Sequence, residues 1–538
     1  MKKQWYRFIG ILLAVCLLLS GCYMEDFVNC IYESFRPYAV STFEEMTYQR
    51  PDPAALQSAA DAACLAGQGD DADACLDAIF AYYDLYDRFS TAHTLAYIHY
   101  SCDMTDIYWE QEYTYCAEHR PLLDTSLEAL YSTLAGSDLR QELEERYFGE
   151  DFFAYYDREF IWDEDMLTLL EEEVQLKNRY YELSEEAGQT EQYSEHYFTQ
   201  YTQPLTELLS QLADVRYRIA AEAGYDNYLN FAYDYYYSRS YSPAQATNYL
   251  LSLQGSVAPL YSRLADSDIW DEVSTYCSST ETFEYVRQAT KTMGGAVSEA
   301  FTQLESGQLY HISYGEHKNP TSFETYLWNY GTPFVFINPY MDQSDKLTFA
   351  HEFGHFANDY VCGGSAASTD VAEVHSQGFE YLSLCYSPDS QLLTRYALSE
   401  SLCIYAEQAA YALFEHQLYS LPQQELTAEN ITALYADVCQ SFGFDSYEWD
   451  QRDLITIPHF YTEPLYIMSY VVSNDVALQL YQQELETPGS GLSLYQQCLS
   501  AQDADIGSFI AAYKLKDPFS ADRLEAVQSI FQEALFSQ

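Results

Sequence analysis

The chain has 538 residues, of which 48% are hydrophobic, and its 82 acidic and 25 basic residues give a formal net charge of −57 at pH 7. This length is enough for a large core and for two or three domains. The charge argues against binding to nucleic acid and against electrostatic attraction to anionic lipids, because both are themselves negatively charged.

The first 21 residues have the pattern of a bacterial lipoprotein signal rather than that of a folded segment. A basic start precedes the apolar run Phe8–Leu19, which is shorter than the ~20 residues of a membrane-spanning helix. The run ends in Leu-Ser-Gly followed by Cys22, a pattern in which cleavage precedes a lipidated cysteine. We therefore expect residues 1–21 to be a signal peptide and Cys22 to carry the lipid. An uncleaved N-terminal anchor is the alternative.

Export would place the protein in the cell envelope, lipid-anchored on the outer side of the cytoplasmic membrane, or in an outer membrane if the organism has one. Cleavage and lipidation would reduce the 13 cysteines to 11, and an odd number leaves at least one thiol unpaired. Cys64 and Cys75 are close enough in sequence to form a disulfide, as are Cys102 and Cys116. Buried free thiols fit the same spacing, so the pairing stays open.

Long segments with helical spacing and few Gly or Pro residues predict a mostly α-helical protein with two lobes. We expect a tether and first helix over residues 22–50, an N-terminal helical lobe over residues 51–200 and a catalytic domain over residues 201–538. Ser242 followed by Pro243 has the pattern of a helix N-cap with proline at the first helical position. The predicted helices are Ala74–Phe89, Ser126–Leu134, Met166–Leu183, Tyr201–Gly224, Pro243–Asp266 and Glu281–Leu304.

One segment, Gly331–Pro339, instead predicts a β-strand, because a short run of β-branched and aromatic residues is bounded by Gly and Pro. Pro333 and Pro339 limit pairing, which favours the edge of a sheet. An edge strand here, just before the histidine-containing helix described next, would offer its backbone groups to an extended peptide. The other interpretation is a strand in the core of a sheet.

The segment Leu347–His355 contains the motif His-Glu-x-x-His, and no proline interrupts Asp345–Val361. On a helix, His351 and His355 are four residues apart and lie on one face, so both imidazoles can bind one ion. Glu352 is then turned toward a water on that ion rather than toward the ion. Two histidines, a carboxylate and an open water position make a catalytic zinc site. The alternative is a pair of histidines on an ordinary helix.

A second helix after the zinc motif supplies the candidate third ligand. A glycine pair ends the first helix, and Glu373 lies 18 residues after His355, where an antiparallel helix would return over the histidines. Glu380 is seven residues further on the same face, where it can orient a histidine by accepting its other ring proton. Asp370, one turn before Glu373, is a second orienting candidate or the N-cap. His375 is a rival ligand that points away from this face.

In combination, these segments resemble the zinc oligopeptidases typified by oligoendopeptidase F and thimet oligopeptidase, over roughly residues 50 to 535. The zinc helix and the third-ligand segment are the most specific parts of the resemblance. The matching segments are TFAHEFGH (348–355), TPFVFIN (332–338), DVAEVHSQGFE (370–380), AGYDNYLNFAYD (223–234), IPHFYTEPLYIMSY (457–470), YKLKDPFS (513–520) and, more loosely, Ser90–Asp106.

The resemblance implies a large, mostly α, zincin-like fold in which two helical lobes enclose a deep cleft, with a small β-sheet beside the zinc helix. It implies a zinc endopeptidase that hydrolyses short unfolded oligopeptides, with Glu352 as the general base on a zinc-bound water. Zn²⁺ would be the cofactor. The implied metal ligands are His351, His355 and Glu373, and the implied orienting residues are Glu380 and Asp370.

The resemblance also implies that His459 and Tyr466 stabilise the oxyanion, and that Phe334, Val335, Phe336 and Tyr470 bind substrate. Tyr461 or Tyr470 could replace Tyr466 as the donor, because the tyrosine spacing differs among branches of the family. Two departures are Asn358, where many members have a further histidine, and His375, where some have proline. Neither departure removes a ligand.

Two other classes of function stay open from the sequence. A catalytically degenerate lipoprotein could capture peptides without cleaving them, although a degenerate enzyme usually loses the base or a ligand, and this chain has both. A zinc carboxypeptidase would use the same metal ligands but would release single C-terminal residues. The expected partners are therefore oligopeptides and, through Cys22, a membrane, with no nucleic acid.

Overall fold

The structure, a computed structural model, describes residues 42–149, 151–157, 164–188, 194–264, 267–364, 368–388, 390–444, 450–500 and 505–536. The predicted signal peptide, the lipidation site Cys22 and most of the predicted tether lie outside these ranges and stay predictions. Among the helices within these ranges, none combines the length and the hydrophobicity that crossing a bilayer requires.

The chain forms two compact units, and each unit is built from three separate parts of the sequence. Unit 1 comprises residues 1–159, 271–393 and 480–504, and unit 2 comprises residues 160–270, 394–479 and 505–538. This division by contacts differs from the linear division at residue 200 that the sequence suggested.

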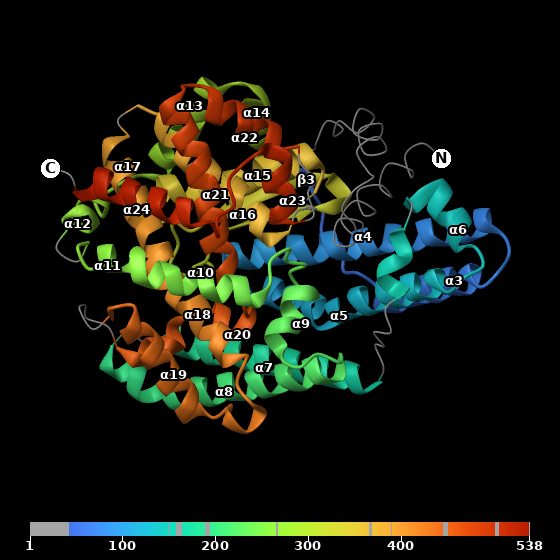
Figure 1. Cartoon of the computed structure of the whole chain (residues 1–538). Helices are drawn as coiled ribbons and strands as arrows, with labels where there is room; N and C mark the ends of the chain where they lie inside the picture. Colours follow the sequence, from blue (N-terminus) through green and yellow to red (C-terminus); the bar gives the residue numbers. More distant parts are fainter. Residues whose placement is uncertain are drawn as a thin grey trace. The chain divides into compact units, whose positions relative to one another are not determined.

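The prediction of a mostly helical protein with one small sheet is confirmed (Figure 1). Unit 1 contains the three strands and the helices that surround them. Its elements are η1 (Phe43–Glu45), α3 (Pro53–Gly67), α4 (Ala72–Cys102), α5 (Ile107–Ala135), α6 (Arg140–Leu143), η2 (Glu144–Phe148), η3 (Phe152–Asp157), α13 (Ser279–Met293), α14 (Gly295–Gly307), β1 (Tyr310–Ile312), β2 (Phe323–Leu327), η4 (Trp328–Tyr330), β3 (Thr332–Ile337), α15 (Asp345–Cys362), α16 (Thr369–Tyr386) and α22 (Ser490–Cys498).

Within the described residues of unit 2, the regular elements are all helices. Three helices, α12 (Ile269–Val273), α17 (Gln391–Cys403) and α21 (Ile467–Glu486), have residues in both units. The elements of unit 2 alone are α7 (Glu164–Gly188), α8 (Glu195–Glu222), α9 (Tyr228–Asp234), α10 (Pro243–Ser256), α11 (Ala258–Tyr261), η5 (Ile404–Gln408), α18 (Ala409–Leu418), η6 (Gln423–Glu425), α19 (Ala428–Ser441), η8 (Gln451–Thr456), α20 (His459–Thr462), α23 (Ile506–Tyr513) and α24 (Ala521–Phe536).

The predicted N-cap of α10 is confirmed, because the Ser242 side chain accepts the backbone N–H of Gln245, whose own side chain accepts the N–H of Ser242. The predicted end of this helix is wrong. The helix stops at Ser256, and α11 contains Pro259, which has no N–H to donate and would clash with the carbonyl one turn earlier.

The predicted helix over residues 281–304 is also wrong, because it is two helices. Gly294 and Gly295 have φ values of 68° and 62°, a conformation that residues with side chains adopt rarely, and they separate α13 from α14. By contrast, α4, α5 and α7 contain their predicted segments and extend beyond them at both ends, whereas α8 begins before its predicted start and ends at Glu222, before the predicted Gly224.

The three-stranded sheet has the order β1-β3-β2, with β1 parallel and β2 antiparallel to β3. The predicted strand is therefore confirmed as β3, but its predicted edge position is wrong. Pro333 lies at the second position of β3 and Pro339 lies beyond its end, so neither proline prevents pairing along the rest of the strand. The side chains of Phe334, Val335 and Phe336 are fully buried, and β2 is the edge strand closest to α15 in sequence and packing.

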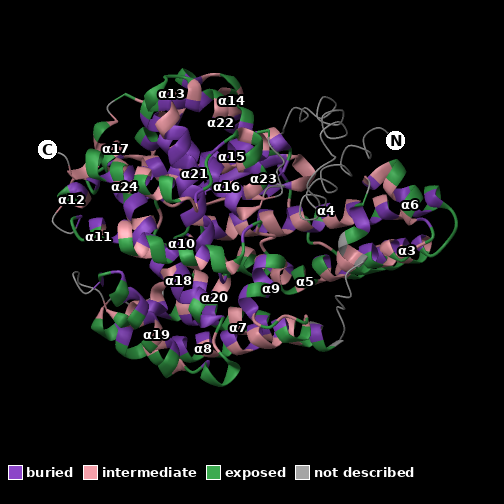
Figure 2. Cartoon of the chain, viewed as in Figure 1, coloured by how far each residue is buried: buried purple, intermediate pink, exposed green. Residues whose placement is uncertain are grey.

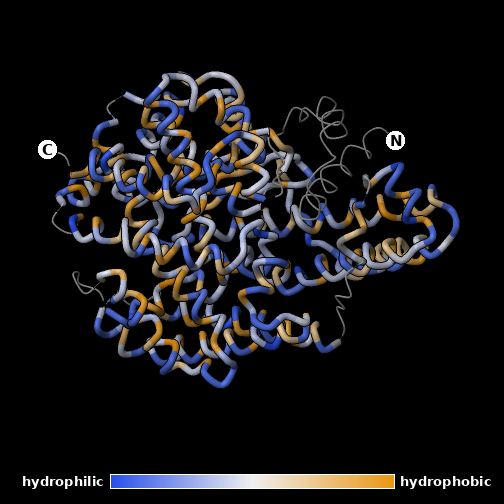
Figure 3. The backbone as a smooth tube through the Cα atoms, in the orientation of Figure 1, coloured by the Kyte–Doolittle hydropathy of each residue, from blue (hydrophilic) through white to orange (hydrophobic). Residues whose placement is uncertain are grey.

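The helices α3, α4 and α5 pack together around a continuous apolar core in unit 1, visible as buried residues along their facing sides (Figure 2). Apolar and polar residues alternate around these helices, as the hydropathy along the backbone shows (Figure 3). The ten cysteines within the described residues are free thiols. These include Cys64, Cys75, Cys102 and Cys116, so neither of the two candidate disulfides is formed.

Unit 2 is organised around Arg216, a fully buried residue of α8. Its Nε donates to Glu173 of α7 at 2.9 Å, and its Nη1 donates to the Tyr419 hydroxyl at 2.7 Å and to the Phe460 carbonyl at 2.9 Å. A further bond reaches the Tyr461 carbonyl. Because a buried guanidinium must be paired, these bonds fix α7, α8, the end of α18 and α20 together.

The ion pair between Glu173 and Arg216 should make the stability of unit 2 depend on pH. Burial alone would raise the pKa of Glu173, but Arg216 and Lys177 outweigh burial and hold it below its ordinary value. A lowered folded-state pKa stabilises the fold above the unfolded pKa of about 4.3, and this contribution is lost as the pH falls through the folded-state value.

We expect Glu173→Gln to reduce the free energy of unfolding by about 3 kcal/mol near pH 7, and the difference from wild type to shrink below about pH 4. The measurement is urea denaturation as a function of pH. Glu207→Gln, which removes an exposed carboxylate from α8, is the matched control. A difference that does not change with pH would contradict this account of the pair.

Candidate active site

The helix α15 is held in unit 1 by aromatic side chains on the face opposite its histidines. Phe349 stacks on Phe283 of α13 with ring centroids 5.8 Å apart. Phe353 contacts Phe301 of α14 at 5.5 Å and Phe379 of α16 at 4.8 Å. Phe349 and Phe353 are fully buried, and each such side chain contributes about 1.5–3 kcal/mol of hydrophobic free energy.

Gly354 allows α15 and α16 to approach closely. A Cβ at this position would lie 2.5 Å from the carbonyl oxygen of His375 and 2.6 Å from the Cα of Ser376, closer than any side chain can be placed. The contact joins residue 354 to residues 375 and 376, while residue 351 contacts residue 380, so the two helices are antiparallel. This confirms the antiparallel helix pair that the sequence predicted.

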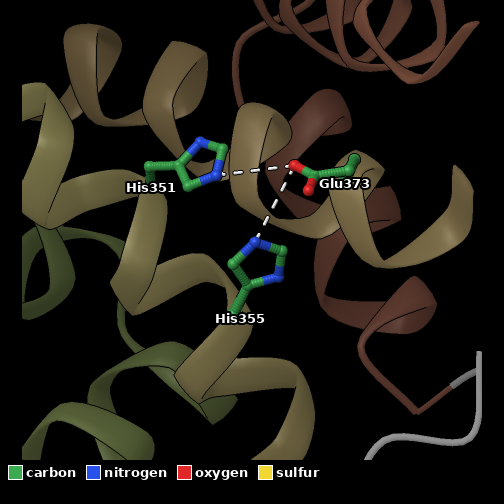
Figure 4. A group of neighbouring side chains, drawn as sticks. All are labelled: His351, His355 and Glu373. Atoms are coloured by element: carbon green, nitrogen blue, oxygen red, sulfur yellow. Dashed lines mark ion pairs between the residues drawn. The ribbon is translucent and has the colours of Figure 1, made fainter. Parts of the chain in front are cut away.

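The close approach brings His351, His355 and Glu373 together, with both imidazole rings directed toward the Glu373 carboxylate (Figure 4). Glu373 Oε2 lies 3.4 Å from His351 Nε2 and 3.8 Å from His355 Nε2. One ligand atom from each of the three residues lies within 4.8 Å of the other two. The three predicted metal ligands therefore form a single group.

This group fits a zinc ion by donor type and by spacing. Two imidazole nitrogens and one carboxylate oxygen are a ligand set of catalytic zinc sites, which keep a fourth position open. Tetrahedral zinc with bonds of about 2.0–2.1 Å requires ligand atoms roughly 3.3–3.4 Å apart. The two carboxylate–imidazole separations of 3.4 and 3.8 Å are close to that requirement, and all three ligand atoms lie within 4.8 Å of one another, so the group would have to contract around an ion.

Two neighbouring residues hold the ligands in position. The Nδ1 of His351 lies 2.6 Å from Glu380 Oε1, which fixes the ring and leaves Nε2 facing the metal position. The structure thus places Glu380 where the sequence predicted. Ser376 donates to Glu373 Oε2 at 2.9 Å, a contact that sequence reasoning missed. Its position three residues after Glu373 on the same helix was the available signal.

Glu352 is largely buried, with 9% of its surface exposed, and lies beside these ligands on α15. Burial raises the pKa of its carboxyl to about 7 in the metal-free protein, with Glu373 and Glu380 acting in the same direction. Burial would lower the pKa of His351, but Glu380, Glu373 and Glu352 outweigh it and raise that pKa to about 10. A dication among these groups would favour the carboxylate and the neutral imidazole.

Three further residues singled out from the sequence lie on α15 and α16, the helices that carry this group. Asp370 lies buried in the first turn of α16, whose N-cap is Ser368, so the N-cap alternative for Asp370 is wrong. His375 is fully buried, and its carbonyl accepts a hydrogen bond from Tyr495, which is consistent with a core position. Asn358 donates to the Leu499 carbonyl at 3.2 Å and so connects α15 to the end of α22.

The predicted oxyanion residues lie together in unit 2. The ring of His459 lies 5.6 Å from that of Tyr466 and 5.7 Å from that of Tyr470, and its Nε2 is 3.4 Å from the Tyr470 hydroxyl. All three side chains are partly exposed. Tyr461 is different, because its side chain is fully buried and stacked on Tyr180 at 4.4 Å.

The turn that carries Tyr466 is held in a strained conformation by residues that sequence reasoning missed. Leu465 has a φ of 67°, which is uncommon for a residue with a branched side chain. Its N–H donates to buried Glu415 at 2.7 Å, and its carbonyl accepts from Arg239 at 2.9 Å. Burial raises the pKa of Glu415 to about 8. No sequence pattern links Glu415 or Arg239 to Leu465, because both lie far from it in the chain.

Comparisons with known proteins agree with the resemblance that the motifs suggested. Residues 43–162 match the Peptidase M3 N-terminal domain. A search of the curated proteins gives no match.

Three solved structures are similar to this chain over almost its whole length. A structure of a candidate oligoendopeptidase F has a TM-score of 0.80 at 19% identity and covers 93% of this chain and 99% of that chain. A second candidate oligoendopeptidase F, from Bacillus anthracis, has a TM-score of 0.77 at 19% identity, and the match covers 92% of this chain and 98% of that chain. Oligoendopeptidase F from Enterococcus faecium has a TM-score of 0.59 at 16% identity, and the match covers 90% of this chain and 96% of that chain.

These findings support the resemblance to M3-family oligopeptidases: residues 43–162 match the N-terminal domain of M3 peptidases, and the mostly helical fold is that of the oligoendopeptidase F structures. At these low identities the structural similarity shows the fold alone, and the chemistry of the chain is argued from its own residues.

Gly354→Ala tests whether the close contact of α15 and α16 builds the metal site. The added methyl group would overlap the backbone of α16 and move Glu373 away from the histidines, so we expect zinc affinity to fall by at least about tenfold. The measurement is competition with a fluorescent zinc chelator. Gly255→Ala is the matched control, because a Cβ there meets no atom within 4 Å. Unchanged affinity in Gly354→Ala would contradict the inference.

Proposed function

We propose that this protein is an oligopeptidase of the M3 type, and that it is a zinc-dependent endopeptidase that hydrolyses short unfolded oligopeptides. The observation that carries the proposal is the convergence of His351, His355 and Glu373 beside Glu352. A degenerate peptide-binding protein has no reason to keep three metal ligands, the orienting Glu380 and a buried carboxylate next to them. The fold of the oligoendopeptidase F structures supports peptides as the substrate.

The residues of the chain would divide the reaction as follows. His351, His355 and Glu373 would hold zinc, which when bound supplies Lewis acidity and lowers the pKa of a water. Glu352 would take a proton from the attacking water and pass it to the leaving amine. Glu380 would keep His351 in the tautomer that presents Nε2 to the metal.

The negative charge that develops on the carbonyl oxygen would be stabilised by His459 and by Tyr466 or Tyr470. The clustering of these three rings supports this assignment, and the partial exposure of the rings leaves them able to meet a substrate. Tyr461 is a poor candidate, because its ring is buried against Tyr180.

A carboxypeptidase is the second candidate reaction, because it would use the same ligands and base. The two reactions differ in their products: an endopeptidase releases internal fragments, whereas a carboxypeptidase shortens every peptide by one C-terminal residue at a time. Mass spectrometry of the products from a peptide amidated at its C-terminus separates them, because amidation blocks the carboxypeptidase reaction alone.

The location of the protein is part of the proposal. The pattern from Phe8 to Cys22 supports export, cleavage after residue 21 and lipidation of Cys22, which would place the peptidase on the outer side of the cytoplasmic membrane or in an outer membrane. Mass spectrometry of the mature N-terminus tests this part, and an unacylated N-terminus would contradict it.

Glu352→Gln is the direct test of the catalytic assignment. It keeps the volume of the side chain but removes the base, so we expect cleavage of a quenched fluorescent peptide to fall by about 10²–10⁴-fold while zinc content stays near one per chain. Removal of zinc by a chelator should abolish activity, and added zinc should restore it. Full activity in Glu352→Gln or in the metal-free protein would reject the mechanism.

Substitution of the three tyrosines identifies the oxyanion donor. We expect the phenylalanine variant of the donor, Tyr466 or Tyr470, to lose about 10²–10³-fold in kcat with little change in KM. Tyr461→Phe is the control and should keep wild-type kcat, because it removes a hydroxyl that has no hydrogen-bond partner within the described residues. A loss of kcat in Tyr461→Phe larger than in the other two would contradict the assignment.

A further inference from the structure

Glu324 lies on β2, an edge strand of the sheet, opposite Val335 of β3. Residues before and after it fix the direction of its side chain. The Phe323 ring stacks on Phe336 at 4.9 Å and contacts Tyr97 of α4 at 4.6 Å. Because successive side chains of a strand point to opposite faces, Glu324 points away from α4.

The opposite face of β2 meets α15. Tyr326, two residues after Glu324 and on the same face, lies 3.3 Å from the position of a Cβ on Gly364, directly after α15. Glu324 therefore faces the body of α15. There Glu352 and Asp359 are seven residues apart and share one side of the helix.

The surroundings of the Glu324 carboxyl are acidic. Burial raises its pKa well above the ordinary value, and the charges of Asp359 and Glu352 raise it further. The backbone N–H of Glu324 lies close enough to the Glu352 carboxylate to lower the pKa of Glu352. Glu324 is thus a direct neighbour of the proposed catalytic base.

Glu324 also lacks a partner of its own. Its Oε1 is buried and makes no hydrogen bond, and no Lys, Arg or His within the described ranges forms an ion pair with it. A buried carboxyl oxygen without a donor is rare in folded proteins and is often explained by a binding role. The residue as a whole is half-buried.

A cation supplied by the substrate would complete this arrangement. An ammonium or guanidinium group beside Glu324 would convert it to the carboxylate and form a charge-assisted hydrogen bond with its unpaired oxygen. A metal ion bridging Glu324 and Glu352 would instead occupy the base and block its proton transfer. The position therefore favours an organic cation over an inorganic one.

We propose that Glu324 forms a subsite for a cationic group of the substrate, on a residue that adjoins the scissile bond. This inference rests on the proposed function, because it identifies the substrates of the same active site. The cation is either a lysine or arginine side chain or the α-ammonium of a short peptide, and both present the same N⁺–H donors to Glu324. The subsite accounts for a buried acidic residue that the zinc chemistry does not use.

The test compares quenched fluorescent peptides that differ in one residue. Lysine, arginine, the neutral isostere norleucine and glutamate are each placed in turn on either side of the cleaved bond, in N-acetylated and free-amine forms. The full-length, zinc-loaded protein is assayed in detergent. Acetylation distinguishes recognition of the α-ammonium from recognition of a side chain.

For wild type we expect kcat/KM to be at least about tenfold higher for the lysine or arginine peptide than for the norleucine peptide. This ratio should fall below about threefold in Glu324→Gln, mainly through KM, and should be partly kept in Glu324→Asp, which retains the charge. Glu316→Gln removes an exposed carboxylate from the loop before β2 and is the matched control, with an unchanged ratio.

Two results would overturn the subsite. One is a lysine-to-norleucine ratio near one in wild type together with equal cleavage of the acetylated and free-amine peptides, and the other is a preference for the cationic peptide that Glu324→Gln does not change. If kcat/KM differs between the acetylated and free-amine peptides but not among the lysine, arginine and norleucine peptides, the α-ammonium is the recognised group and the subsite stands. If zinc-loaded wild type cleaves none of the peptides, the proposed function fails and the subsite fails with it. Equal cleavage of all peptides overturns the subsite alone.

Discussion

The close packing of α15 against α16 is the constraint on which the candidate metal site depends. The two helices come from consecutive segments of the chain, and Gly354 lets their backbones approach to a distance that any side chain would prevent. This contact sets the spacing of His351, His355 and Glu373, and the same packing brings Glu380 to His351. The aromatic residues on the other face of α15 pack against α13 and α14 and so hold α15 in place.

Ionisable side chains that are buried or half-buried organise each unit in a similar way. In unit 1, the ligands and Glu352 form a cluster of titratable groups whose pKa values are moved apart by burial and by one another, as is common at catalytic sites. In unit 2, Arg216 fixes the backbone of α20, and Arg239 with Glu415 fixes the turn at Leu465. Such groups are stable only when they are paired, so they specify the local geometry of His459 and Tyr466.

The sequence predicted those parts of the site that depend on the spacing of residues along a single helix. The four-residue spacing of His351 and His355 and the seven-residue spacing of Glu373 and Glu380 each define one helix face, and the structure places them as expected. Features that depend on pairing between distant segments were not predictable. The prolines around β3 suggested an edge strand, but pairing with β1 and β2 decides its place, and the partners of Arg216 lie up to 245 residues away. The break at Gly294 shows that helical periodicity continues through a position whose backbone conformation ends the helix.

X-ray absorption spectroscopy of the zinc-loaded protein tests the central claim most directly, because it reports the atoms bound to the metal. The structure predicts one zinc per chain with two imidazole nitrogens and carboxylate or water oxygens at about 2.0–2.2 Å, and no sulfur. It also predicts that one imidazole contribution is lost in His351→Ala. A sulfur ligand at about 2.3 Å, or an unchanged spectrum in that variant, would show that zinc binds elsewhere and would contradict the account.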